Sequence, residues 1–304
     1  MSNGAGARAV VVTGVSTGIG LGVARVLARR GFHVFGSVRR VEDGERVRAE
    51  LGQNFAPLIF DVTQPDSIHA CVPTVSAHLA GQTLSGLVNN SGIAIGGPLI
   101  YQPLDEVRRV IEVNTIGALA ATQAFVPLLG SDRSRTGPPG RIINISSVAG
   151  RMSAPFLGAY AASKRGLEGM SESLRRELML FGIDVVVINP GAIATPIWDK
   201  AEGQGEERYA KTEYAPLLQR FLARALSTGR SGLPVESVGE VVLEALTTRR
   251  PRTFYPIMRN RLTAWTIPLA IPARVLDRLI ARRLGLSFRA EPRSGEVDES
   301  RSSG

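Results

Sequence analysis

Short runs of consecutive apolar residues, many of them β-branched, recur along most of the chain, and helical patterns separate them. A continuous apolar run is typical of a strand that is buried on both faces, as in a parallel sheet. The pattern predicts strands over residues 9–13, 32–38, 56–60, 86–88, 141–145, 183–189 and 253–255. It predicts helices over residues 21–30, 42–51, 67–79, 104–129, 158–181, 206–226 and 236–246.

The alternation of strands and helices predicts the fold class. Right-handed crossovers between parallel strands build one sheet with helices on both faces. We therefore expect an α/β protein with a single doubly wound, Rossmann-type parallel sheet and a C-terminal helical extension. The expected divisions are a flexible N-terminus (1–7), the Rossmann-type domain (8–255) with a substrate lid (about 194–232), a basic amphipathic extension (256–287) and a disordered tail (288–304).

The cysteine and histidine content limits the chemistry. Cys71 is the only cysteine, so the chain forms no internal disulfide and no multi-cysteine metal site. The three histidines are too scattered for a metal-ligand pattern, and we expect no metal. Residues 1–8 lack the apolar core of a signal peptide, and no apolar run reaches the roughly 20 residues of a membrane-spanning helix. These features predict a cytoplasmic protein.

A glycine-rich segment, TGVSTGIG, joins the first strand to the first helix (Thr13 to Gly20). Gly14, Gly18 and Gly20 permit a tight turn, and the helix that follows points its free amide groups at a phosphate. A plain glycine turn is the alternative. The position between a buried strand and a helix favours a nucleotide site.

The end of the second strand bears on cofactor choice. Val38 occupies the place where an acidic residue would bind the ribose 2′-hydroxyl of NAD(H), and Arg39 follows it. An arginine fork suits a phosphate, so NADP(H) is favoured over NAD(H). The alternative is that Arg39 and Arg40 form a solvated pair in the loop. Asp61, at the end of the third strand, can accept a hydrogen bond from the adenine amino group.

Tyr160 and Lys164 lie four residues apart in a predicted helix, and therefore on the same helix face. A nearby ammonium group favours the phenolate, so we expect Lys164 to lower the pKa of Tyr160 and make it a general acid and base. The alternative is a half-buried tyrosine beside a solvated lysine. Ser147, considered alone, would be interpreted as a turn-capping hydroxyl.

Together these residues resemble the short-chain dehydrogenase/reductase family of the YxxxK type. The similarity runs in order and spacing from residue 8 to about 196 and is loose beyond. The matching positions are the TGxxxGxG segment from Thr13 to Gly20, Asp61, the NNSG segment at 89–92 with Ser91 in place of alanine, Asn114, Ser147, Tyr160, Lys164, and the PGxxxT segment from Pro190 to Thr195. The expected cofactor contacts are Gly14, Ser16, Thr17, Gly18, Ile19, Gly20, Arg39, Asp61, Val62, Asn90, Ser91, Gly92, Tyr160, Lys164, Pro190, Gly191, Ile193 and Thr195.

The resemblance implies an NAD(P)(H)-dependent oxidoreductase that interconverts a carbonyl and an alcohol. Ser147 and Tyr160 would bind the carbonyl oxygen, and Tyr160 would transfer the proton. Lys164 would hold the nicotinamide ribose, and Asn114 would hold a water that links Lys164 to solvent. A nucleotide-sensing protein without turnover is the competing interpretation. The presence of all four residues argues against it.

The substrate is expected to be apolar and steroid-, retinoid- or lipid-like. Apolar residues of the predicted lid and of the segment before Tyr160 would line its pocket: Ile197, Trp198, Leu217, Leu218, Phe221, Leu222, Met152, Pro155 and Phe156. The alternative is that these side chains only pack the lid onto the body.

The net charge of +9 lies mainly in residues 248–283, which contain nine arginines and one aspartate. Within this stretch, residues 272–286 form a helical pattern with a basic face. Such a helix can bind an anionic membrane, although packing on the body is favoured because most amphipathic helices face a core. Nucleic-acid binding is not expected, since no recognition module is present. The apolar face of this pattern consists of Val275, Leu276, Leu279, Ile280 and Leu284.

The resemblance also implies a homodimer or homotetramer, formed through the helices predicted at 104–129 and 158–181. Small residues on the first of these would permit close packing between subunits. They are Gly117, Ala118, Ala120, Ala121 and Ala124.

Overall fold

The computed structural model describes residues 8–195 and 206–286. The chain divides into two compact units, Met1–Ala270 and Ile271–Gly304. The expected flexible N-terminus and disordered tail lie outside the described residues, as do Ile197 and Trp198 of the expected lid.

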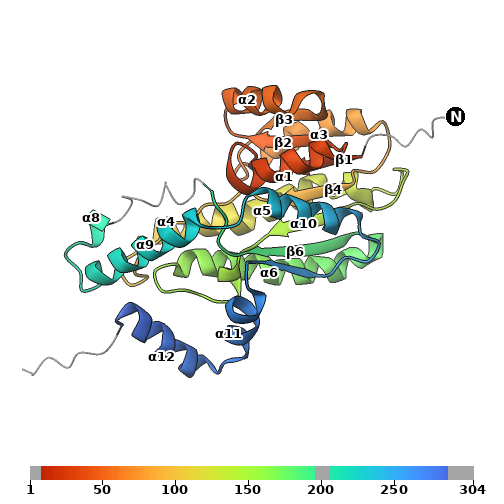
Figure 1. Ribbon diagram of the computed structural model, residues 1–304. Coiled ribbons are helices and arrows are strands. Elements are labelled where there is room, and N and C mark those ends of the chain that lie inside the picture. Colours follow the sequence, from red (N-terminus) through yellow and green to blue (C-terminus); the bar gives the residue numbers. More distant parts are fainter. Residues whose placement is uncertain (1–7, 196–205, 287–304) are drawn as a thin grey trace, which may run out of the picture. The chain divides into compact units, whose positions relative to one another are not determined.

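The large unit is built on one seven-stranded sheet in which all neighbouring strands are parallel (Figure 1). The strand order is β3-β2-β1-β4-β5-β6-β7. The strands are β1 (Ala9–Val12), β2 (His33–Val38), β3 (Phe55–Ile59), β4 (Gly86–Asn89), β5 (Arg141–Ile145), β6 (Asp184–Pro190) and β7 (Phe254–Ile257). The predicted fold class is confirmed. The last strand continues past residue 255, where the sequence had placed the domain boundary.

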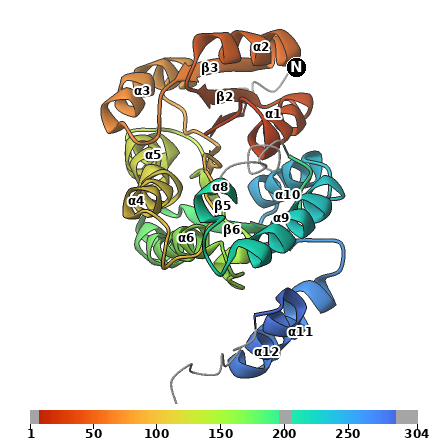
Figure 2. The same ribbon diagram turned by 90° about the vertical axis from the view of Figure 1, so that its left-hand side faces the viewer.

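Helices cover both faces of the sheet, as Figure 2 shows. One face packs against α1 (Gly18–Arg29), α2 (Val41–Leu51) and α10 (Glu236–Thr247). The other packs against α3 (Pro65–Leu79), α5 (Gly117–Phe125) and α6 (Gly158–Glu177).

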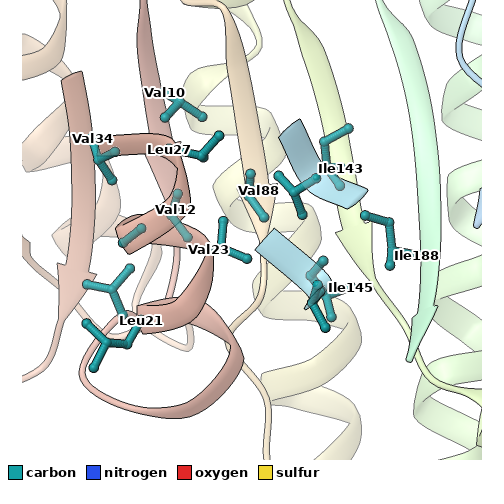
Figure 3. Packing of buried hydrophobic residues seen from close by; sticks show 14 of the residues in the cluster. Val10, Val12, Leu21, Val23, Leu27, Val34, Val88, Ile143, Ile145 and Ile188 are labelled. Carbon is teal, nitrogen blue, oxygen red and sulfur yellow. The ribbon is translucent and has the colours of Figure 1, made fainter. Parts of the chain in front are cut away.

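Residues along each strand alternate between the two hydrophobic cores. In β1, Val10 and Val12 belong to one core, which Figure 3 shows. Val11 belongs to the other core. Because successive strand side chains point to opposite faces, a strand between two helical layers is apolar at most of its positions. This is the physical reason for the continuous apolar runs in the sequence.

The stretch predicted as one helix over 104–129 is divided. It consists of α4 (Leu104–Ile111), a π-helical turn (Glu112–Ile116), α5, and a second π-helical turn (Pro127–Ser131). The first π-helical turn contains Asn114, whose side chain is held by groups outside the helix. Such π-bulges are frequent at functional sites.

The small residues of this stretch do not form a free surface. Gly117, Ala118, Ala121 and Ala124 are buried within the same chain, two of them in the core against the sheet, and Ala120 is half-buried against that core. The expectation that they pack against another subunit is therefore wrong in its choice of residues. The larger side chains of Ile111 and Ile116 are exposed instead, with exposed fractions of 36% and 44%.

The helix predicted over 206–226 is two helices, α8 (Glu206–Tyr209) and α9 (Ala215–Arg230). Pro216 stands in the first turn of α9, where proline is favoured because its missing amide would have no helical partner there. After β7 the large unit ends in a π-helical turn (Leu262–Thr266) and a short helix α11 (Ile267–Ala270), both within the expected C-terminal extension (256–287).

The small unit contains helix α12 (Ala273–Leu284), which follows Pro272 and ends at Gly285 in the left-handed conformation. Throughout the described residues, no helix is long and apolar enough to cross a bilayer.

Candidate active site

The residues expected to carry the chemistry follow the carboxyl ends of β1, β4, β5 and β6, which are neighbours in the sheet. In a parallel sheet these ends share one edge, and ligands bind in the crevice beside it. The topology therefore brings together the glycine turn, the NNSG segment, Ser147 and the PGxxxT segment.

The glycine turn has the geometry of a phosphate cradle. Gly14 and Gly18 have φ angles of 71° and 62°, which favour glycine. A Cβ atom on Gly20 would lie 2.2 Å from the carbonyl oxygen of Gly14. Thr17 precedes α1 without a side-chain cap, so the first amides of the helix are free for an anion.

Asn90 and Ser91 fasten this turn to the end of β4. The Asn90 amide donates to the carbonyls of Thr13 and Gly14, at 2.9 and 3.0 Å. The Ser91 backbone amide donates to the Thr13 hydroxyl, at 2.9 Å. These contacts show that Asn90 shapes the nucleotide turn, a role that its place in the motif alone does not specify.

A cavity of about 380 Å³ lies beside the turn, lined by Ser16, Thr17, Arg39, Arg40 and Asp43. Asp43 accepts from Arg40 at 2.9 Å and from Arg46 at 3.1 Å, and these two cations lower the pKa of its carboxyl. In the described part of the chain, Arg39 makes no ion pair or hydrogen bond. Arg39 is exposed and lines the cavity, so its interpretation as a phosphate-binding group and the alternative of a solvated loop residue both stay predictions.

Asp61 and Val62 follow β3 at the adenine side of the expected cofactor site. One carboxylate oxygen of Asp61 accepts from the backbone amide and the hydroxyl of Thr63, at 3.0 and 2.8 Å. Val62 is buried and lies so close to Gly117 that a Cβ there would be 2.8 Å from its methyl carbon. The loop is therefore anchored on α5.

The PGxxxT segment after β6 contacts neighbouring parts of the chain at three points. The Gly191 amide donates to the carbonyl of Ile257 at 2.8 Å. Ile193 pairs with Leu233, which joins the two ends of the expected lid. Thr195 lies beside the glycine turn, since a Cβ on Gly18 would be 3.7 Å from its side chain. The structure thus brings the segment next to the nucleotide turn.

Ser147 both caps a turn and faces the expected acid. Its hydroxyl oxygen accepts from the Ala149 amide at 3.1 Å, at the start of a short 3-10 turn (Val148–Gly150). It also interacts with the Tyr160 phenol. Because the cap uses only a lone pair, the hydroxyl hydrogen stays available for donation. The turn-capping and catalytic interpretations of Ser147 are compatible.

The electrostatics of Tyr160 and Lys164 differ from the expectation. Burial raises the pKa of the Tyr160 phenol, and the Ser147 hydroxyl acts against this rise. Burial lowers the pKa of Lys164 to about 8, against the opposing effect of the Glu168 carboxylate. The expected lowering of the tyrosine pKa by Lys164 is therefore wrong for the free protein, in which burial of the phenol dominates.

Asn114 connects three parts of the site. Its amide nitrogen donates to the Ile93 carbonyl and to the Ser163 hydroxyl, both at 2.9 Å, and its oxygen accepts from the Ile93 amide at 2.8 Å. A Cβ on Gly92 would lie 3.2 Å from this oxygen and 3.5 Å from the Lys164 ammonium. Asn114 therefore holds the loop after β4 close to Lys164. The water that it was expected to hold stays a prediction.

A small hydrophobic cluster packs the lid onto the segment that precedes Tyr160. Phe156, Tyr209 and Leu218 are buried together, and Leu217, Tyr214, Phe221 and Leu222 pack against them. The Tyr101 hydroxyl donates to the Glu213 carboxylate at 3.1 Å, and Arg208 forms an ion pair with Glu106. Met152 and Pro155 are half-buried in the segment before Tyr160. Tyr209 and Tyr214 are additions that the sequence reading missed, although both lie within the stretch identified as the lid.

A buried carboxylate, Glu168, also escaped the sequence reading. It lies on α6 four residues after Lys164 and contacts Ser146, Arg151 and Asn189. The spacing of four, which places Glu168 on the same helix face as Lys164, was the available signal.

Comparison with known proteins gives consistent matches. A family model described as short chain dehydrogenase matches residues 8–205. An NADPH-dependent 3-dehydrocapnine reductase from Ornithobacterium rhinotracheale is 36% identical over 277 residues, covering 91% of this chain and 97% of that protein. Human retinol dehydrogenase 5 is 32% identical over 288 residues, covering 89% and 87%. A crystal structure of a short-chain dehydrogenase from Streptomyces avermitilis superposes with a TM-score of 0.72 at 26% identity, covering 93% and 99%.

Proposed function

Because the chain belongs to the short-chain dehydrogenase family, we propose that it is an NADP(H)-preferring oxidoreductase, with NAD(H) as the weaker cofactor. It interconverts a carbonyl and an alcohol on an apolar small molecule. One observation carries the proposal. The Ser147 hydroxyl faces the Tyr160 phenol just after β5, with Lys164 beside them and the glycine turn two strands away.

The proposed reaction divides the chemistry between cofactor and protein. When bound, the nicotinamide supplies or accepts the hydride. Ser147 and Tyr160 donate hydrogen bonds to the substrate carbonyl oxygen and stabilise the negative charge that develops there. The raised pKa of Tyr160 keeps the phenol protonated at neutral pH, which is the form that an acid needs for reduction. In the oxidative direction the phenolate would take the alcohol proton.

Lys164 supplies positive charge near the proton donor. With a pKa of about 8 it is mostly protonated at neutral pH, and its ammonium is held by the Ile145 carbonyl at 2.9 Å. In our proposal it holds the nicotinamide ribose hydroxyls and stabilises the phenolate left after proton transfer. Asn114 holds the water that returns a proton to Lys164 from solvent.

Two observations support NADP(H). Arg39 lies at the cavity beside the glycine turn and, within the described residues, has no partner of its own. A guanidinium group suits the 2′-phosphate that distinguishes NADP(H) from NAD(H). A relative that is 36% identical is named as NADPH-dependent.

An apolar substrate is supported by the lid. Its aromatic and aliphatic cluster includes Phe156, which belongs to the segment between Ser147 and Tyr160. Retinol dehydrogenase 5 is named for an apolar alcohol, and the other relative for a dehydro compound that it reduces. We propose a substrate of the steroid-, retinoid- or lipid-like class.

The test is a panel of apolar and polar ketones and aldehydes offered with NADPH or NADH. The absorbance of the reduced nicotinamide reports turnover. We expect turnover of apolar carbonyls with NADPH, and slower turnover with NADH. Cofactor binding without turnover on any carbonyl or alcohol would favour a nucleotide-sensing protein instead.

A second proposal concerns the membrane. The segment after β7 exposes the apolar side chains of Leu262, Ile267 and Leu269, with exposed fractions of 61%, 44% and 45%, beside the exposed Arg259 and Arg261. Basic and apolar groups together suit an anionic bilayer surface. We propose that a cytoplasmic form of the protein docks peripherally through this segment, aided by the arginine-rich α12. Cosedimentation with anionic vesicles at low and high salt tests this. An absence of salt-sensitive binding would exclude it.

Self-association is the third expected property. We propose a homodimer or homotetramer that covers the exposed Ile111 and Ile116. Light scattering of the wild type and of an Ile116→Lys variant tests it. A monomeric wild type would exclude it.

A further inference from the structure

The side chain of Glu168 is buried, and the proposed reaction does not use it. The residue is 1% exposed and lies on α6, one turn after Lys164. One carboxylate oxygen accepts from the Ser146 hydroxyl at 2.8 Å and from the Asn189 amide. The other oxygen lies 2.6 Å from Nε of Arg151. A buried carboxylate is costly unless such partners compensate for lost water.

Each of these partners adjoins Ser147. Ser146 precedes it in the chain, and the Asn189 amide also donates to the Ser147 carbonyl, at 3.1 Å. Arg151 follows the short turn that the Ser147 hydroxyl caps. The carboxylate of Glu168 therefore contacts the residue before the turn (Ser146), the residue after it (Arg151) and Asn189 of β6.

The turn also lies directly on the carboxylate. A Cβ on Gly150 would be 2.5 Å from the Glu168 oxygen and 3.0 Å from the Ser146 hydroxyl. Only a glycine permits this approach. The distance between helix α6 and the Ser147 turn is thus set by contact with Glu168.

Glu168 shares its helix with the two residues that complete the reacting group. Tyr160 and Lys164 lie two turns and one turn before it, and the Glu168 carboxylate raises the pKa of Lys164 against the effect of burial. The other charged groups at this place are Arg151, which pairs with Glu168, and Glu172, which lies 3.7 Å from Arg151.

We propose that Glu168 is a positioning residue for the oxidoreductase reaction, because its carboxylate fixes the turn that carries Ser147 against the helix that carries Tyr160 and Lys164. The inference rests on the proposed function. A purely structural ion pair between Glu168 and Arg151 is the competing explanation, and it predicts an effect on folding only.

The main test compares Glu168→Gln with the matched control Glu172→Gln. The glutamine at 168 keeps an acceptor for Ser146 and Asn189 but loses the charge. We expect its kcat to fall about 10-fold to 100-fold, as for a slightly misplaced reacting group, with the KM for NADPH little changed. The alkaline limb of its pH–rate profile should move to lower pH, because Lys164 loses a neighbouring negative charge. The Glu172 variant should keep the wild-type kcat and limb.

A wild-type kcat and an unmoved alkaline limb in a folded Glu168→Gln variant would overturn the inference. If this variant does not fold, Ser146→Ala removes one contact of the same carboxylate, and we expect it to lower kcat by a few-fold without changing the KM for NADPH. Full activity of Ser146→Ala would then count against the inference.

A measurement that does not depend on turnover distinguishes failure of this inference from failure of the proposed function. The pH dependence of unfolding reports the pKa of Lys164 directly, and Glu168→Gln should extend the titration window to lower pH. A missing shift overturns the action of Glu168 on Lys164. A clear shift in a protein that turns over no carbonyl contradicts the proposed reaction and leaves the effect of Glu168 on the pKa of Lys164 intact.

Discussion

The ammonium of Lys164 lies 5.8 Å from the centre of the Tyr160 ring and donates its hydrogen bond to the carbonyl of Ile145, 2.9 Å away. The lysine is therefore anchored on the end of β5 while its charge stays near the phenol. Lys164 is buried and Tyr160 is half-buried in the free protein, so the phenol keeps its proton at neutral pH and the ammonium loses its proton more easily than in water. Reduction begins from this protonation state.

Replacement of Tyr160 by phenylalanine keeps the ring and removes the acid. We expect kcat for carbonyl reduction to fall at least ~100-fold, as for the loss of a general acid. NADPH binding, followed by nucleotide fluorescence, should change little because the rest of the site stays in place. A variant with near-normal turnover would show that another group supplies the proton.

Turnover should depend on pH through Lys164. Below a pKa of about 8 the lysine is charged, and above it the charge is lost. We expect the reductive kcat/KM for NADPH to decline as pH rises through about 8, because kcat/KM reports the ionising groups of the free enzyme. Lys164→Met should be almost inactive at all pH values and lack this limb. A wild-type limb that persists in a still active Lys164→Met variant would assign the titration to a different residue.

The free energy of unfolding of the cofactor-free protein should also depend on pH through Lys164. In the folded protein burial lowers the pKa of Lys164 to about 8, from the ordinary lysine value of 10.5. In this window the unfolded chain binds more protons, so the free energy of unfolding rises with pH, by about 3 kcal/mol in total for this group. Denaturant titrations of the wild type and Lys164→Met, compared from pH about 7 to about 10, measure the difference. Parallel curves for the two proteins would contradict the buried, charge-destabilised lysine.

The choice of cofactor should depend on Arg39. We expect Arg39→Ala to raise the KM for NADPH by about 10-fold and to leave that for NADH nearly unchanged, because only NADPH carries the 2′-phosphate. Arg48→Ala is the matched control, since Arg48 is an exposed arginine of the neighbouring helix α2 that does not line the cavity. Equal losses with both cofactors would indicate a general structural effect.

Most of the fold could be predicted from local patterns. Val10, Val11 and Val12 all have to be apolar because β1 lies between two helical layers, and that requirement is visible in the sequence. Glycine turns are similarly visible, since the φ angle of Gly14 lies in the left-handed region that favours glycine. The strands and most helices therefore appear where they were expected.

Features that depend on tertiary contacts could not be predicted. Burial determines that the pKa of Tyr160 is raised rather than lowered, and no sequence motif specifies burial. Glu168 was overlooked because its partners come from a separate strand and loop, and only its spacing from Lys164 was visible. The burial of Ala121 within its own chain likewise depends on how α5 is rotated against the sheet.

Gly20 offers the sharpest test of the nucleotide turn. A Cβ at this position would lie 2.2 Å from the Gly14 carbonyl and 2.4 Å from the Asn90 amide, so Gly20→Ala must displace the turn. We expect NADPH affinity to fall at least ~10-fold, because displaced amides no longer point at the phosphates.

Gly169→Ala is the control. Its Cβ would meet nothing within 4 Å on the exposed side of α6, and it should raise stability by about 0.5 to 1 kcal/mol through helix propensity. Isothermal titration with NADPH and thermal unfolding of both variants measure the two effects. Unaltered NADPH affinity in a folded Gly20→Ala variant would mean that the cofactor does not bind over this turn.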